Sequence, residues 1–203
     1  MITLYHAPQS RSSRIIWLLE ELGAPYEIRP VSIFRPMTGT GSPDPANPHP
    51  DKQVPAIEHE GELVAESVGI FLYLTEAFPE AGLGPVAGAP GRGTFLTWVT
   101  WYAAAMEPAM FAAMLGELEA SPLKKRGYDA VVARIEGALA RGSYMLGESF
   151  SAVDLLVASA IKFARQAFPE SAALDAYVAR CATRPAAIRA AGLDEAVGLQ
   201  LAA

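Results

Sequence analysis

Hydrophobic positions in the first third of the chain switch between a strand-like and a helix-like spacing. Residues 2–5 form a short apolar run, and apolar positions then recur on one helical face over residues 14–22. Gly23, Ala24 and Pro25 interrupt that helix, and residues 26–33 are expected to supply a second strand. The order strand, loop, helix, strand predicts an α/β unit at the N-terminus.

A second group of elements is predicted between residues 53 and 78. Pro55 belongs at the first residue of a strand, and the Glu60-Gly61 turn makes residues 55–58 and 62–65 antiparallel neighbours. Apolar residues then return to helical spacing, so Ser67 is expected as the N-cap of a helix. Such a helix start attracts an anionic group.

The rest of the chain shows only helical patterns. Residues 79–93 are rich in proline and glycine and are expected to connect an N-terminal domain, 1–78, to a helical domain, 94–203. Glu107-Pro108 interrupts the longest apolar stretch, which favours a bent, buried helix over a membrane span. The predicted helices cover residues 94–118, 124–141, 152–167, 174–183 and 186–191. Residues 35–51 contain five prolines and are expected to form a long loop.

Composition removes several classes of function. The 203 residues are 51% hydrophobic and carry a net charge of −6 without a concentrated basic stripe, so a globular protein that does not bind nucleic acid is expected. The single cysteine, Cys181, excludes a disulfide framework and a CxxC pair, and three scattered histidines give no metal-ligand spacing. The start of the chain lacks a secretory pattern, so the cytoplasm is the expected location. No membrane partner is expected.

Two of these motifs together resemble a known family. The run Val54-Pro55-Ala56-Ile57, the hairpin and Glu66-Ser67 at a helix start closely resemble the glutathione site of cytosolic glutathione transferases. Residues 150–154 resemble the capping signature of that family, in which Ser151 and Asp154 satisfy each other's backbone amides. The resemblance is to serine-type bacterial members, theta- or beta-like. It implies the glutathione transferase fold, with a thioredoxin-like α/β N-terminal domain and an all-α C-terminal domain.

In this family a hydroxyl donor stabilises the glutathione thiolate, because a thiol with a pKa of about 8.5 is mostly protonated at neutral pH. Ser10 follows the first strand and stands at the mouth of the first helix, where serine-type transferases carry that hydroxyl. Ser10 also suits the simpler role of a helix cap. Ser12, Ser13 and Tyr5 are the alternatives for the donor.

The same resemblance assigns the remaining contacts to glutathione as co-substrate. Glu66 is expected to accept from the γ-glutamyl ammonium and Ser67 to bind its carboxylate, although Glu66 also fits a solvated charge at a helix start. A cis Pro55 lets the Val54 backbone meet the cysteinyl part. Lys52 and Gln53 are placed near the glycyl end.

The second substrate is expected to be a small hydrophobic electrophile. Aromatic and methionine side chains suit a broad apolar pocket, although each of them also fits an ordinary core. The candidates are Tyr5, His6, Phe34, Trp98, Trp101, Tyr102, Met106 and Met110.

These residues predict an enzyme that transfers the glutathione thiol to an electrophile, in the service of detoxification. The rival is a non-catalytic binding or stress-response module of the same fold, because fold does not fix function. A thiol-disulfide or dehalogenase-type relative would need a cysteine near Ser10, and none occurs there.

The family resemblance also predicts a homodimer. Phe71, Phe78, Phe95 and Trp98 offer large apolar groups at the helices that would meet the partner. Sedimentation at micromolar concentration should therefore give twice the 21.6 kDa mass of one chain. A mass near one chain would overturn the prediction.

Overall fold

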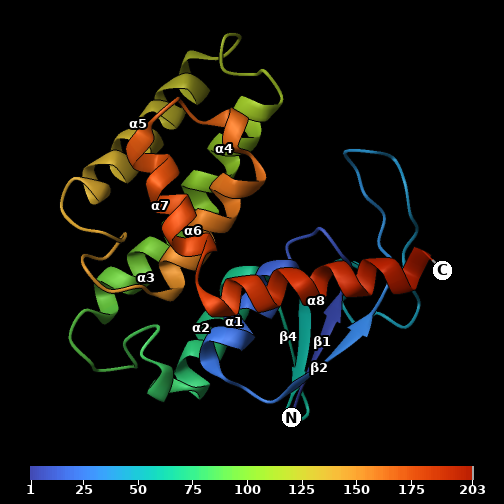
Figure 1. The fold of residues 1–203 in the computed structure, drawn as a ribbon. Helices are drawn as coiled ribbons and strands as arrows, with labels where there is room; N and C mark the ends of the chain where they lie inside the picture. The colour runs from blue at the N-terminus through green and yellow to red at the C-terminus, as the bar shows by residue number, and fades with distance from the viewer. Residues whose placement is uncertain (203) are drawn as a thin grey trace. The chain divides into compact units, whose positions relative to one another are not determined.

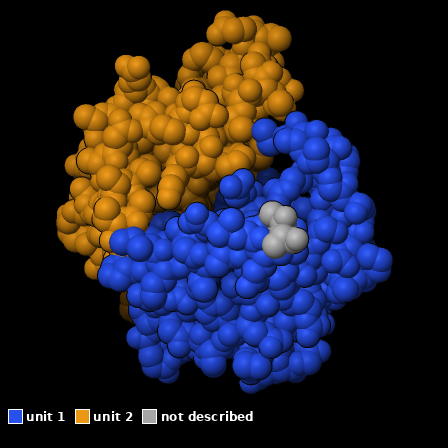
Figure 2. Space-filling view, turned by 45° about the vertical axis from the view of Figure 1, so that its right-hand side comes forward, with its two compact units in different colours: residues 1–81, 185–203 blue, residues 82–184 orange. Residues whose placement is uncertain are grey.

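The computed structural model describes residues 1–202 and divides them into two compact units. Unit 1 comprises residues 1–81 together with the C-terminal segment from Pro185, and unit 2 comprises residues 82–184 (Figure 2). The C-terminal segment was expected to belong to the helical domain, but its contacts are with unit 1. Unit 1 is therefore built from both ends of the chain.

Unit 1 contains a four-stranded mixed sheet in the order β2-β1-β3-β4 (Figure 1). Strand β1 pairs in parallel with β2 and antiparallel with β3, which continues through the Glu60-Gly61 turn into antiparallel β4. Leu4 lies opposite both Ile28 and Ile57. The strands are β1 (Ile2–His6), β2 (Tyr26–Pro30), β3 (Ala56–His59) and β4 (Glu62–Ala65). The sheet is thioredoxin-like, as predicted.

Strand β2 ends at Pro30, earlier than the expected residue 33. The Val31 amide still donates to the His6 carbonyl at 2.9 Å, but the Ser32 amide donates to Asp44, at 3.3 Å, and the Ser32 hydroxyl to the Ser42 carbonyl. The chain leaves the sheet because the backbone after Val31 bonds within the long loop.

Three helices complete unit 1. They are α1 (Ser13–Leu22), α2 (Ser67–Ala77) and α8 (Pro185–Ala202), and a short turn covers Pro79–Ala81. Helix α1 ends at Gly23, whose left-handed conformation, φ 63°, lets its amide donate back to Leu19. Helix α8 runs beside α1 and extends well beyond the predicted 186–191 (Figure 1). The fully buried core includes Leu4, Ile15, Ile16, Leu18, Leu19, Ile57, Ile70, Phe71 and Leu74.

Unit 2 is entirely helical. Its elements are α3 (Arg92–Trp101), a π turn (Tyr102–Met106), α4 (Glu107–Met114), α5 (Pro122–Leu139), α6 (Ala152–Phe163), a short turn (Arg165–Ala167) and α7 (Ala172–Ala182). At the place where a bend was expected, Glu107-Pro108, the helix is interrupted by the π turn. Pro108 then lies in the first turn of α4, where its missing amide hydrogen is tolerated. No helix among residues 1–202 is long and apolar enough to cross a membrane.

The capping signature at α6 is present in full. Asp154 is 0% exposed and accepts from the Ser151 amide and hydroxyl, both at 2.9 Å. It also accepts from the Met145 amide at 2.7 Å and the Tyr177 hydroxyl at 3.1 Å. Burial raises the pKa of Asp154, and these hydrogen bonds oppose that rise. The carboxylate joins the α6 start to α7 and to the preceding loop.

We expect Asp154→Ala to lower the free energy of unfolding by roughly 2 to 4 kcal/mol, because several buried donors lose their acceptor. Urea unfolding of the full chain measures this. Asp129→Ala, which removes an exposed carboxylate paired with Lys125, is the control and should leave the midpoint nearly unchanged. Equal midpoints in the two variants would contradict the role given to Asp154.

Candidate functional site

The loop between β1 and α1 folds around the Ser10 hydroxyl. Ser10 Oγ donates to the Ala7 carbonyl at 2.7 Å, lies 2.7 Å from Ser12 Oγ and accepts from the Ser12 amide at 3.1 Å. Helix α1 begins at Ser13, so Ser12, and not Ser10, occupies the cap position. Ser10 is partly exposed and stands at the helix start without capping it.

The hydroxyls of the three alternatives to Ser10 each have a side-chain partner within the protein. Ser12 is fully buried, with its Oγ 2.8 Å from His6 Nδ1, and the Ser13 hydroxyl donates to Asp194 at 2.5 Å. Tyr5 is buried, and its hydroxyl donates to Glu58 at 2.8 Å. Burial and then Glu58 raise the pKa of Tyr5. A group that must reach a bound sulfur needs accessible surface, which Ser12 and Tyr5 lack. Ser13 is partly exposed like Ser10, but its hydroxyl is bonded to Asp194. The assignment to Ser10 stays a prediction.

A second loop leads into β3 through the peptide bond between Val54 and Pro55. That bond is cis, as predicted, and both residues are buried. The Gln53 carbonyl just before them accepts from Asn47 Nδ2 at 2.8 Å. Asn47, which the sequence analysis missed, is itself fully buried and accepts from the His49 amide at 3.0 Å. An Asn two residues before the bonded amide is typical of such turns.

Lys52 lies in the same loop with a positive φ of 53°. Its ammonium donates to the Asn47 carbonyl at 2.7 Å, and its backbone amide donates to the His49 carbonyl at 2.9 Å. An ammonium has three hydrogens, so two remain for a ligand. Gln53 beside it is exposed.

Helix α2 begins one residue earlier than predicted. Glu66 occupies the cap position, and Ser67, expected there, is the first helical residue. The reason is the Glu66 backbone, whose φ of 65° and ψ of 126° cannot continue a helix, while its carbonyl accepts the first helical bond from Ile70 at 2.9 Å. Glu66 is exposed.

At the start of this helix, the Ser67 hydroxyl lacks a hydrogen-bond partner in the described part of the chain. Its Oγ is buried and has no hydrogen-bond partner among the described residues. A buried polar atom left in this way costs about 1 to 3 kcal/mol. It stands beside the free amides of an eleven-residue helix, which favour an anion.

Backbone strain gathers in these same segments. Among the described residues, four that are not glycine have a clearly positive φ: Gln9, Lys52, Glu60 and Glu66. Glu60 belongs to the hairpin turn, and the other three lie beside Ser10, Val54 and Ser67. Such conformations cost about 1 to 3 kcal/mol each and persist where the surroundings enforce them, often at functional sites.

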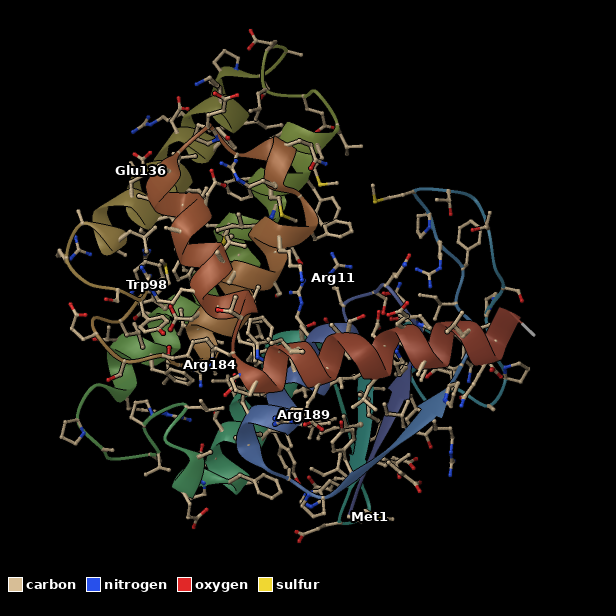
Figure 3. All side chains as sticks on the ribbon, viewed as in Figure 1. Met1, Arg11, Trp98, Glu136, Arg184 and Arg189 are labelled. Carbon is tan, nitrogen blue, oxygen red and sulfur yellow. The ribbon has the colours of Figure 1, made fainter. Side chains whose placement is uncertain are left out.

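Helix α8 supplies a residue that the sequence analysis missed. The Asp194 carboxylate accepts from the Gln9 amide at 3.2 and 3.3 Å and from Ser13, and it lies 3.2 Å from His6 Nε2. Partial burial alone would raise the pKa of Asp194, but its interactions with His6, Ser13 and Gln9 lower it. The sequence signal was the helical spacing that continues past residue 191. Arg189 adds an ion pair with Glu20 of α1 at 2.6 Å (Figure 3).

The candidates for the electrophile pocket divide between the units. In unit 1, Tyr5 and His6 are buried, and Phe34 is 51% exposed. In unit 2, Trp98 and Trp101 pack edge to face at 5.0 Å, and the Arg134 guanidinium lies over both rings. The buried members of unit 2 are Trp98, Tyr102, Met106 and Met110. Grouping all eight residues around one substrate stays a prediction.

Comparison with known proteins finds likenesses to one family. Residues 4–82 match the family model described as the glutathione S-transferase N-terminal domain. The chain is 24% identical over 173 residues to glutathione S-transferase 3 of Schizosaccharomyces pombe, a match that covers 76% of this chain and 70% of that protein.

Solved structures share the whole fold. A glutathione S-transferase from Actinobacillus pleuropneumoniae has a TM-score of 0.82 at 21% identity, covering 96% of this chain and 93% of that one. A glutathione transferase from Methylococcus capsulatus has a TM-score of 0.79 at 23% identity, with coverages of 98% and 100%. A sphingomonad glutathione S-transferase, solved with glutathione, has a TM-score of 0.78 at 23% identity, with coverages of 95% and 98%.

Proposed function

We propose that this chain is a glutathione S-transferase, which binds glutathione in unit 1 and activates its thiol for attack on a small hydrophobic electrophile. The observation that carries the proposal is the buried, unpartnered Ser67 hydroxyl at the start of α2. A carboxylate placed there would satisfy the hydroxyl and the free amides together.

The site offers a partner to each part of the tripeptide. Ser67 receives the γ-glutamyl carboxylate, and Glu66, exposed at the helix start, accepts from the ammonium. The Val54 backbone meets the cysteinyl part as an added strand would. Lys52, with two hydrogens left after its bond to Asn47, and Gln53 face the glycyl end.

Activation rests on donation of a hydrogen bond, without proton abstraction by serine. The Ser10 hydroxyl turns from the neutral Ala7 carbonyl to the sulfur, since a hydrogen bond to an anion is about twice as strong. The start of α1 adds its positive dipole end. Lowering the thiol pKa by two units takes about 2.7 kcal/mol, which one such bond and a helix terminus can supply.

The electrophile is proposed to be apolar, because its candidate contacts are mostly aromatic and methionine side chains. The thiolate sulfur attacks the electrophilic atom, forms a carbon–sulfur bond and displaces a leaving group or adds to a double bond. We propose the protein as a homodimer in the cytoplasm, acting in detoxification.

A non-catalytic glutathione-binding module is the second candidate. It is favoured by the Ser10 hydroxyl being already bonded to Ala7 within its own loop. Capture on immobilised glutathione, followed by a conjugation assay with a generic aromatic electrophile, separates the two. Binding without turnover would support the module, and turnover would support the enzyme.

Ser10→Ala should raise the pKa of the bound thiol by about one to two units and reduce turnover at neutral pH about tenfold or more, with little change in glutathione affinity. Thiolate absorbance against pH measures the pKa. Ser143→Ala, which removes a hydroxyl bonded to Glu148 in unit 2, is the control. An unchanged titration in Ser10→Ala would transfer the role to another hydroxyl.

Ser67→Ala should weaken glutathione binding about tenfold or more, because a charge-assisted hydrogen bond is lost. The ligand-free variant should be as stable as the wild type or more stable, since the removed hydroxyl has no protein partner. Calorimetry and thermal unfolding measure the two effects. Wild-type affinity would refute the placement of the carboxylate.

Glu66→Gln should weaken binding in the same assay, because the amide no longer offers a charge to the ammonium. Glu60→Gln is the matched control, since Glu60 also has a positive φ, 52°, but lies at the hairpin turn. Equal affinities in the two variants would remove Glu66 from the site.

A further inference from the structure

Four side chains in unit 1 form a continuous series of polar contacts that ends at Ser10. Asp194 Oδ1 of α8 lies 3.2 Å from His6 Nε2, and His6 Nδ1 lies 2.8 Å from Ser12 Oγ. Ser12 Oγ lies 2.7 Å from Ser10 Oγ. These contacts therefore join the last helix to the end of β1 and to the loop that carries the proposed donor.

The two residues in the middle of this series, His6 and Ser12, are fully buried. Burying polar side chains costs free energy, which argues against a purely structural role. His6 and Ser12 are both 0% exposed, and buried polar groups lose hydration that only well-made bonds replace. Helix α8 has other means of docking, because Ala186, Ala190 and Val197 are buried and Arg189 pairs with Glu20. Holding α8 in place does not require a buried imidazole.

The order Asp, His, Ser is also found in hydrolases, where the serine is a nucleophile. Ser12 does not fit that role, because it has no exposed surface from which to attack a substrate. The series of contacts instead continues from Ser12 to the partly exposed Ser10. Its function must lie in its effect on the Ser10 hydroxyl.

The contacts of Ser12 show that use. Its Oγ lies 2.7 Å from Ser10 Oγ and 2.8 Å from His6 Nδ1, and it bonds the Ala7 amide and carbonyl, both at 3.2 Å. Ser10 in turn donates to the same Ala7 carbonyl. Ser12 therefore holds the Ser10 oxygen in place, and His6 holds Ser12.

The carboxylate at the far end lies against the imidazole and also holds the loop. Asp194 Oδ1 lies 3.2 Å from His6 Nε2, and the same carboxylate accepts from the Gln9 amide and the Ser13 hydroxyl. The loop that carries Ser10 is therefore held both through Ser12 and through Asp194.

We propose that Asp194 and His6 are positioning residues that act through Ser12 to hold the Ser10 hydroxyl where it can donate to the glutathione sulfur. This inference rests on the proposed function, because it assigns a purpose to the Ser10 donor. No proton is transferred: Ser10 donates a hydrogen bond to the thiolate, and the other three side chains keep its oxygen in place.

The test measures the thiol pKa of bound glutathione by thiolate absorbance, with Kd by calorimetry, in His6→Asn, Asp194→Asn and Ser12→Ala. Asp194→Asn keeps an oxygen acceptor for Gln9 and Ser13 but loses the charge. Each variant should raise the thiol pKa by about one unit, which is about tenfold less thiolate below both values, and change Kd less than threefold. If His6→Asn does not fold, Ser12→Ala, which removes a single oxygen, carries the test.

Two further arms separate this mechanism from loss of structure. Arg189→Ala removes an ion pair between α8 and α1 but leaves Asp194, His6, Ser12 and Ser10 intact. It should leave the thiol pKa unchanged. In a Ser10→Ala background, Ser12→Ala and Asp194→Asn should cause no additional shift, since they act only through Ser10.

The outcomes are distinct. A shift that persists in the Ser10→Ala background, or one matched by Arg189→Ala, overturns the inference. A normal thiol pKa in His6→Asn, Asp194→Asn and Ser12→Ala also overturns it, while a shift in Ser10→Ala alone leaves the proposed function standing. No shift in Ser10→Ala, or no glutathione binding by the wild type, overturns the Ser10 assignment and the inference with it.

Discussion

The carboxylate of Asp194 is the interaction on which the Ser10 loop depends. It accepts from the Gln9 amide and the Ser13 hydroxyl and lies against His6, so one side chain contacts the strand end, the loop and the first helix turn. Gln9 has a positive φ of 54°, an unfavourable conformation that needs such a partner. Arg35 holds the same loop through the Pro8 carbonyl at 2.6 Å.

The candidate site is assembled from segments that are locally unfavourable and globally enforced. Gln9, Lys52 and Glu66 each hold a backbone with a positive φ, and Ser67 keeps a buried hydroxyl without a protein partner among the described residues. A chain selected for stability alone would relax these positions with glycine or alanine. Their coexistence around one end of the sheet is the physical argument that a ligand completes this part of the molecule.

Local signals sufficed to predict the strands, the hairpin at Glu60-Gly61 and the capping box at Ser151, because each depends on neighbours in sequence. The thioredoxin-like pairing of the strands followed from the family resemblance. The cis bond before Pro55 followed from a family resemblance rather than from propensity. Asp194 was missed because its partners lie at the other end of the chain. The cap at Glu66 was displaced by a backbone angle that composition does not encode.

Unit 1 is discontinuous along the chain, with residues 1–81 completed by the helix from Pro185. Synthesis proceeds from the N-terminus, so the sheet and the Ser10 loop leave the ribosome well before the carboxylate that organises them. During that interval Gln9 has no anionic acceptor and His6 faces a vacant place in the core. In the order of translation, the Ser10 loop therefore gains its last partner only after the whole of unit 2 has been made.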